Sequence, residues 1–190
     1  RHWMDQAVMA NQLGVRESEI APDAETAWEE PIWVTAENSE VEKTNLELAK
    51  SMRESLLKDD QEAYMRHVAE DVSSRYVGDR EPMNGMASYR KGIEEWATMA
   101  DHSYDMVDMW AAGDWVVAVN DVTSKLKQNM PGTKNTKGKE VNTTVLEFLQ
   151  FDQGKLKSHW VFENSMAYPV QLGLIDMPMS QPKKTTKNSR

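Results

Sequence analysis

The sequence contains no cysteine in 190 residues, which excludes disulfides, thiolate nucleophiles and cysteine-bound metals. It has no apolar run near the roughly 20 residues that a membrane helix needs. Basic residues are scarce, because 22 Lys and Arg stand against 31 Asp and Glu and give a net charge of -9. Phosphate binding requires clustered basic residues, so we expect neither nucleic acid nor a membrane as a partner. The start has no signal-peptide character, which makes the cytoplasm the default expectation.

The apolar residues that are present suffice for a folded core. They make up 39% of the chain and include 7 Trp and 13 Met. The length fits one full domain with extensions, and we place that domain at residues 44–175. The segment at 176–190 carries four basic residues in its last ten positions, which predicts a basic flexible tail.

The first residues repeat the end of the predicted domain. Residues 2–15 read HWMDQAVMANQLGV, and residues 159–174 read HWVFENSMAYPVQLGL, so both share His-Trp and Gln-Leu-Gly. Internal repeats are sought first because they reveal duplicated units. We predict that residues 1–15 are a partial copy of a domain end. Tandem duplication is the favoured account, and a duplicated end kept as an arm is the alternative.

Residues 16–43 form a predicted acidic linker or arm. Nine acidic residues and no basic one lie between positions 17 and 42, and Pro22 and Pro31 interrupt any helix. Trp28 and Trp33 are too apolar for a free linker. We therefore expect part of this segment to lie across the domain surface.

Three helices are predicted in the first half of the domain. Thr44 and Glu47 have the spacing of a capping box, and apolar residues then recur at helical spacing to about residue 57. Asp60 can cap a second helix, which we extend to about residue 71. A short strand at 75–77 follows, and Asn84 precedes a third helix. The apolar face of the third helix contains Met86, Tyr89, Ile93, Trp96 and Ala100.

The second half of the domain is predicted to be strand-rich. Four runs at 103–112, 115–128, 140–151 and 155–163 are rich in Val, Thr and aromatic residues and are separated by turn signals. Short turns favour antiparallel neighbours. The fold class is therefore α+β, with three N-terminal helices packed on a curved antiparallel sheet. Such a sheet forms a cone with an internal cavity, where small molecules bind.

Several short motifs then occur in a characteristic order. Residues 100–114 end in a Gly-Asp turn, Gly-Lys-Glu-Val stands at 138–141, and Gly-Lys-Leu at 154–156 is followed by His-Trp and Gln-Leu-Gly. Over about residues 45–174 this order and spacing resemble the SnoaL-like polyketide cyclases. They belong to the nuclear-transport-factor-2-like superfamily, which also holds ketosteroid isomerases and limonene epoxide hydrolases.

The resemblance implies a cofactor-free enzyme that closes a ring by intramolecular aldol chemistry. In that family an Asp at the end of the last strand, seven residues before Gln-Leu-Gly, works as acid and base. The same count from Gln171 reaches Asn164 here, beside the carboxylate of Glu163. The family's frequent Glu two residues before the Trp is Ser158, and the N-terminal echo keeps an acid, Asp5, at the counted position.

Two carboxylates interrupt apolar strand faces, Asp121 and Glu147. A buried carboxylate has a raised pKa, which suits a general base. The alternative for each is a sheet edge or dimer face, where the acid meets solvent or a Lys. We predict three catalytic residues, with Asp121 or Glu163 as the base and His159 assisting as a proton shuttle. A surface histidine beside Lys157 is the alternative for His159.

The predicted ligand contacts are mostly aromatic. Residues of this kind more often form core, and their functional role is to line a site for a flat apolar ligand. His67 and His102 lack metal-ligand spacing, so we assign no metal, while the absence of a cofactor is what the family resemblance implies. The predicted substrate-binding residues are Tyr64, Trp96, Trp110, Phe148, Trp160 and Asn164.

Two functions remain open. One is a cyclase or isomerase that abstracts a proton next to a carbonyl of a small apolar molecule. The other is a non-catalytic ligand-binding or interaction domain that has lost the acid, which Asn164 and Ser158 favour. A carboxylate that opens into the cavity beside a second polar group would favour the enzyme. In either case we expect a homodimer through the outer sheet face, because helices leave that face uncovered.

Overall fold

The computed structural model describes residues 34–76 and 81–175. The predicted domain copy at 1–15, the predicted linker up to residue 33 and the predicted tail at 176–190 lie outside these residues. Within the described ranges, no helix is both long enough and apolar enough to cross a bilayer.

Helix α2 (Glu40–Leu57) begins four residues before the predicted start. Ser39 caps it, because its Oγ accepts a hydrogen bond from the Glu42 amide at 3.3 Å while the Glu42 carboxylate accepts one from the Ser39 amide at 2.7 Å. Thr44 donates instead to the Glu40 carbonyl inside the helix. The capping box predicted at Thr44 is therefore wrong by about one turn, and the last residues of the predicted linker are helical.

The second predicted helix is much shorter than expected. Asp60 does cap helix α3 (Gln61–Met65), accepting from the Ala63 amide at 2.9 Å. Strand β1 (Val68–Tyr76) follows, so the prediction of helix to residue 71 is wrong. Val68 and Val72 fit a helical stripe by spacing, but both are β-branched and pack equally well on a sheet.

Helix α4 (Met86–Met99) confirms the third predicted helix. It follows the short strand β2 (Met83–Asn84), which the sequence did not reveal. Gly85 caps the helix with φ at +81°, in the left-handed region that glycine adopts without strain. Tyr89 is the residue of α4 that is fully buried, and it faces the sheet.

Within the part of the chain that the structure describes, six strands form one sheet in the order β2-β1-β6-β5-β4-β3. The four long strands match the predicted runs closely. They are β3 (Ala100–Ala112), β4 (Trp115–Leu126), β5 (Glu140–Asp152) and β6 (Lys155–Glu163). Strand β1 pairs in parallel with β6, whereas the other neighbours are antiparallel. The sheet is therefore mixed, and the expectation of a purely antiparallel sheet is corrected at this one pair.

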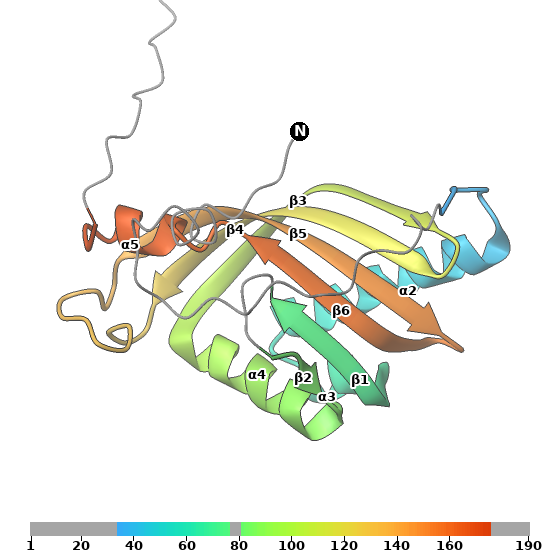
Figure 1. Cartoon of the computed structure of the whole chain (residues 1–190), viewed down its shortest axis with the longest axis horizontal. Coiled ribbons are helices and arrows are strands. Elements are labelled where there is room, and N and C mark those ends of the chain that lie inside the picture. Colours follow the sequence, from blue (N-terminus) through green and yellow to red (C-terminus); the bar gives the residue numbers. More distant parts are fainter. Residues whose placement is uncertain (1–33, 77–80, 176–190) are drawn as a thin grey trace, which may run out of the picture.

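The helices α2, α3 and α4 lie on one side of the curved sheet (Figure 1). The main core lies between these helices and the inner face of the sheet, and includes Met52, Tyr64, Val116 and Leu156. Helix α5 (Ala167–Gln171) covers the far end of β5. This arrangement confirms the α+β class with three helices on a curved sheet.

Glu42 ties the start of α2 to the turn between β3 and β4. Its Oε1 accepts from the Gly113 amide at 2.8 Å. The backbone hydrogen bonds from Gly113, Glu37 and Ser39 lower the pKa of this carboxyl from 4.5 to about 2. The helix layer is thus fixed to the sheet by an ionised side chain.

One irregularity in β6 decides which of its side chains face the helices. Leu156 pairs with Phe151, but Ser158 pairs with Gln150, so Lys157 is an extra residue on β6. A bulge of this kind shifts the alternation of the strand by one residue. After the bulge, His159 and Val161 are buried, whereas Trp160 is 38% exposed on the outer face.

Candidate functional site

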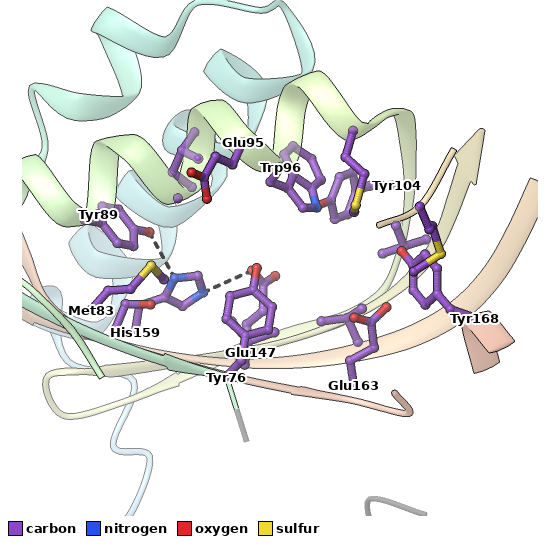
Figure 2. A pocket seen from close by; sticks show the side chains of 18 residues that line it. Tyr76, Met83, Tyr89, Glu95, Trp96, Tyr104, Glu147, His159, Glu163 and Tyr168 are labelled. Atoms are coloured by element: carbon purple, nitrogen blue, oxygen red, sulfur yellow. Dashed lines mark hydrogen bonds and ion pairs between the residues drawn. The ribbon is translucent and has the colours of Figure 1, made fainter. Parts of the chain in front are cut away.

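A pocket of about 450 Å³ lies between α4 and the inner face of the sheet. Its wall is largely apolar, with Ile93, Trp96 and Met99 from α4 and Val122, Val145 and Val161 from the sheet. Polar side chains enter this wall at several points. Figure 2 shows the carboxylates of Glu147 and Glu163 rising from the sheet toward α4, with His159 beside Glu147.

Strand pairing orders the polar residues into rows across the pocket floor. At one end, Ser74 lies between Met83 and His159. The next row contains Tyr76, Val161 and Glu147. The row after that pairs Glu163 with Val145. Glu147 therefore has His159 on one diagonal and Glu163 on the other, at the roughly 7–8 Å typical of diagonal neighbours in a sheet.

Glu147 is the centre of a hydrogen-bonded network. Its Oε2 accepts from Arg53 Nη2 at 2.7 Å and from Asn120 Nδ2 at 2.8 Å. Its Oε1 lies 3.2 Å from His159 Nε2. Arg53 reaches across from α2, donates also to Asn120 Oδ1 and lies over the ring of Tyr104. The carboxylate, the amide and the guanidinium thus satisfy one another inside the protein.

The network continues through two buried tyrosines. His159 Nδ1 lies 2.9 Å from Tyr89 Oη, which lies 2.6 Å from Tyr64 Oη. An ionised Glu147 only accepts, so His159 Nε2 is the donor to its carboxylate. In the neutral form of the ring Nδ1 accepts from Tyr89, and in the charged form Nδ1 donates to Tyr89. In both forms the hydrogen-bonded chain links the two tyrosines to the Glu147 carboxylate.

This environment keeps Glu147 ionised. Burial alone raises its pKa, but the hydrogen bond and charge of His159, together with Arg53, outweigh burial and hold the pKa of Glu147 below its ordinary value. The phenols respond in the opposite way, because burial raises the pKa values of Tyr76, Tyr104 and Tyr168. At neutral pH the pocket therefore presents an ionised carboxylate beside protonated phenols.

A second carboxylate lies farther along the pocket, and a second histidine supports Trp96 in the pocket wall. Glu163 Oε1 accepts from Thr143 Oγ1 at 2.7 Å. Tyr168 donates to Ser124 Oγ at 3.1 Å, and Ser124 also bonds His102 Nδ1 at 2.9 Å. His102 stacks on Trp96 with ring centroids 3.6 Å apart, and burial lowers the pKa of this histidine. The stack fixes the Trp96 ring in the pocket wall.

Three predicted site residues line the pocket, namely His159, Glu163 and Trp96. Tyr64 is buried behind Tyr89 and reaches the site through the hydroxyl of Tyr89. Asn164 lies just after β6, where its Oδ1 accepts from the Met166 amide at 3.2 Å, so its side chain shapes the turn before α5.

Four predicted site residues lie on the outer face of the sheet, away from the pocket. Asp121 is exposed there, opposite Asp105, and accepts from Thr144 at 2.6 Å. Its assignment as the base of the cavity is therefore wrong. The predictions for the other three are corrected for the same reason, because a strand alternates its side chains between two faces. Trp110, Phe148 and Trp160, together with Val117, form a continuous row across four strands, which we call the outer row.

Several residues of the site were not among the predicted site residues. Glu147 has the same sequence signal as Asp121, because each carboxylate interrupts an apolar strand face. Only the register of strand pairing shows which of the two faces the pocket. Ala118 pairs with Glu147, whereas Asp121 pairs with Thr144, which puts the two carboxylates on opposite faces. Arg53 and Asn120 gave no sequence signal, because a helical Arg and a strand Asn are ordinary surface residues.

The residues of this site do not resemble a metal centre. Within 34–76 and 81–175, no three His, Asp or Glu side chains are grouped so that they could hold a metal ion. Glu147 is instead matched by Arg53, with both side chains about 85% buried: the exposed fractions are 16% and 15%. The Arg53 guanidinium supplies the counter-charge for Glu147, and Asn120 and His159 supply further hydrogen bonds.

A family model for SnoaL-like polyketide cyclases matches residues 47–172. The chain belongs to the SnoaL-like polyketide cyclase family. No curated protein matches its sequence. The match to the family model confirms the family resemblance drawn from the motifs at 100–114, 138–141 and 154–173.

Solved structures place this SnoaL-like chain in the nuclear-transport-factor-2-like fold. A candidate SnoaL-like polyketide cyclase from Jannaschia sp. CCS1 is 12% identical with a TM-score of 0.67, and the match covers 75% of this chain and 100% of that one. A candidate polyketide cyclase from Xanthomonas campestris pv. campestris is 18% identical, with a TM-score of 0.64 and coverages of 70% and 98%. AclR, a candidate hydroxylase from Streptomyces galilaeus, is 21% identical, with a TM-score of 0.62 and coverages of 72% and 90%. At such identities the likeness establishes the fold alone.

Proposed function

We propose that this SnoaL-like protein is a cofactor-independent enzyme that removes a proton from the carbon next to a carbonyl of a small apolar molecule, as a cyclase or isomerase. The observation that supports this most is the Glu163 carboxylate in the wall of an apolar pocket, within hydrogen-bond reach of Thr143. A pocket lined only by apolar side chains would have favoured a binding module instead.

Glu163 is a better base than Glu147. Arg53 and His159 stabilise the ionised form of Glu147 and lower its pKa, and a carboxylate held in this way has little affinity for another proton. Glu147 therefore supplies fixed negative charge and orients His159. We assign His159 an indirect role in proton abstraction, because its two ring nitrogens already contact Glu147 and Tyr89.

The phenols of the pocket can stabilise the carbonyl oxygen of the substrate during the reaction. When Glu163 takes the proton from carbon, the electrons of the C–H bond form an enolate, and negative charge develops on the carbonyl oxygen. The protonated phenol of Tyr104 can donate a hydrogen bond to that oxygen, whereas Tyr168 already donates to Ser124. Burial keeps the Tyr104 phenol protonated. A neutral donor in an apolar site stabilises an enolate without giving up its proton.

The reaction can end in two ways with the same residues. In an isomerisation, Glu163 returns its proton to a different carbon of the enolate. In a ring closure, the enolate carbon attacks a second carbonyl of the same molecule, and the resulting alkoxide takes the proton from Glu163. Both routes balance without a cofactor, because the proton and the electron pair stay within the substrate and Glu163.

A non-catalytic ligand-binding domain is the second candidate function. Asn164 stands at the family's acid position and uses its side chain to accept from the Met166 amide. An amide cannot exchange a proton as a carboxylic acid does. A protein with this substitution could bind a molecule in the pocket without converting it.

Exchange of carbon-bound hydrogen for deuterium distinguishes the two functions. The protein is mixed with 2-tetralone in D₂O, and NMR follows the signal of the protons next to the carbonyl. We expect the wild type to accelerate exchange and Glu163→Gln to slow it by about 100-fold or more, the usual contribution of a general base. Glu140→Gln is the matched control, because Glu140 lies exposed on the same sheet.

Full activity in Glu163→Gln would overturn the assignment of the base. If the wild type binds 2-tetralone but leaves its protons unchanged, the result supports the binding domain. Isothermal titration calorimetry on the same samples supplies the binding measurement.

A further inference from the structure

Ser74 lies at the end of the pocket floor opposite Glu163. Its side chain points to the inner face of β1, where it lines the pocket and is 1% exposed. Its Oγ has no hydrogen-bond partner among the residues that the structure describes. Ser73, the preceding residue, faces outward, and its Oγ donates to Asn84 Oδ1 at 3.0 Å. Two adjacent serines thus differ in both face and hydrogen bonding.

A buried hydroxyl without a partner is costly for folding, and native proteins contain few such groups. The polar neighbours of Ser74 cannot relieve this cost, because His159 and Tyr89 are bonded to each other at 2.9 Å and to further partners. Met83, on the other side of Ser74, offers an apolar chain. The hydroxyl is therefore available, as donor or acceptor, to a molecule in the pocket.

The separation of Ser74 from Glu163 indicates the shape of that molecule. Ser74 pairs with His159, which lies four residues before Glu163 on β6. Four residues of strand span roughly 13 Å. Between the two ends, Val161 forms the middle of the floor, with Tyr76 on one side and the Glu147 carboxylate on the other, and Trp96 and Ile93 form the roof. A flat apolar body fits between the polar ends.

We propose that Ser74 is a ligand-binding residue that recognises an oxygen at the end of the substrate remote from the reacting carbonyl. The substrate class is then an elongated, flat, largely apolar compound with a carbonyl at one end and a hydroxyl or carbonyl oxygen at the other. The inference rests on the proposed function only in naming the Glu163 end as the reacting end. Binding at Ser74 needs no turnover.

Two rigid ligands test the proposal by equilibrium binding. 2-Naphthol carries one oxygen, and 2,6-dihydroxynaphthalene carries a second oxygen at the opposite end of the same ring system. Calorimetry gives the Kd ratio of the two ligands for wild type, Ser74→Ala and Ser73→Ala. We expect wild type to favour the diol by about three- to tenfold, the equivalent of one neutral hydrogen bond. Ser74→Ala should bring the ratio to about one, whereas Ser73→Ala should keep the wild-type ratio.

Thermal unfolding separates recognition from packing. Ser74→Ala removes an unsatisfied hydroxyl, so it should unfold at a temperature no lower than the wild type. An unchanged ligand ratio in Ser74→Ala would overturn the proposal, as would a wild type that does not favour the diol. Equal weakening of both ligands with a lowered unfolding temperature would show that Ser74 serves packing alone. None of these outcomes depends on the deuterium exchange assigned to Glu163.

Discussion

Replacing Arg53 by Met should destabilise the fold most strongly near neutral pH. Arg53 and Glu147 are 2.7 Å apart, and both side chains are largely buried. Removing one partner of a buried ion pair costs about 3–5 kcal/mol, because the other charge stays in the interior. His159 and Asn120 still donate to Glu147 in the variant. We therefore expect the lower end, about 3 kcal/mol of unfolding free energy, or about 6–12 °C in Tm for a domain of this size.

The pH dependence follows from the pKa of Glu147. In the folded wild type this pKa lies below the ordinary 4.5, so ionisation of Glu147 stabilises the protein above about pH 4.5, and this contribution is lost as the pH falls through the folded pKa. The Arg53→Met variant loses one of the two groups that lower the pKa of Glu147, so this pKa rises relative to wild type and the carboxyl is more readily protonated at acid pH. The difference between wild type and Arg53→Met should therefore narrow as the pH is lowered from 7.5 to 4.5.

Urea unfolding followed by tryptophan fluorescence at the two pH values measures this effect. Arg90→Met is the control, because it breaks the Arg90–Glu62 ion pair, in which the Glu62 side chain is 70% exposed. Exposed pairs contribute little to stability, so the control should unfold almost like the wild type. A cost below about 1 kcal/mol for Arg53→Met at pH 7.5, or an equal cost at both pH values, would refute the assignment of Glu147 as a buried ionised group.

Three further predictions concern the helix layer and the outer face. Glu42→Gln should lower the Tm at pH 7, and the difference from wild type should vanish as the pH falls from 4.5 toward 2, since the pKa of Glu42 is lowered to about 2 when folded; thermal scans across this range test it. Asp60→Ala removes the cap of α3 and should cost about 1 kcal/mol in urea unfolding, and an unchanged midpoint would show that the cap contributes nothing. We propose that a second copy of the chain covers the outer row, in which Trp110 and Trp160 are 42% and 38% exposed. Light scattering should give a dimer mass for the wild type and a monomer mass for Trp160→Glu, and a monomeric wild type would rule this interface out.

Local signals in the sequence predict the long strands well. Gly113 and Gly154 each have positive φ in the turn between two strands, and both turns are visible as glycine beside a polar residue. Strand ends therefore coincide with predictions to within about three residues. The start of α2 was missed by one turn because two Ser/Thr-x-x-Glu patterns follow each other, and sequence alone does not rank them.

Long-range pairing explains most of what was not predicted. Strand β1 is held by parallel pairing with β6, and the paired residues lie 85 to 88 positions apart in the sequence, so nothing near Val68 indicates a strand. Asp121 and Glu147 have the same local pattern, and the loop at 127–139 between their strands hides the register that separates them. Arg53 joins the site only because α2 crosses β4 and β5.

The bulge at Lys157 makes two surfaces of the molecule depend on one position in the chain. If Lys157 were instead paired in a regular ladder, His159 and Glu163 would move to the outside of the sheet, while Trp160 would turn inward and replace the polar wall by an aromatic one. Deleting Lys157 removes the extra residue and keeps the pairs on both sides of it, Leu156 with Phe151 and Ser158 with Gln150. A deletion of three nucleotides at this codon would thus leave the acid-base pocket in place, whereas closing the bulge with Lys157 retained would convert it into an aromatic one. The role of a β6 residue can therefore be transferred from one protein of this fold to another only after the sequence alignment has accounted for this bulge.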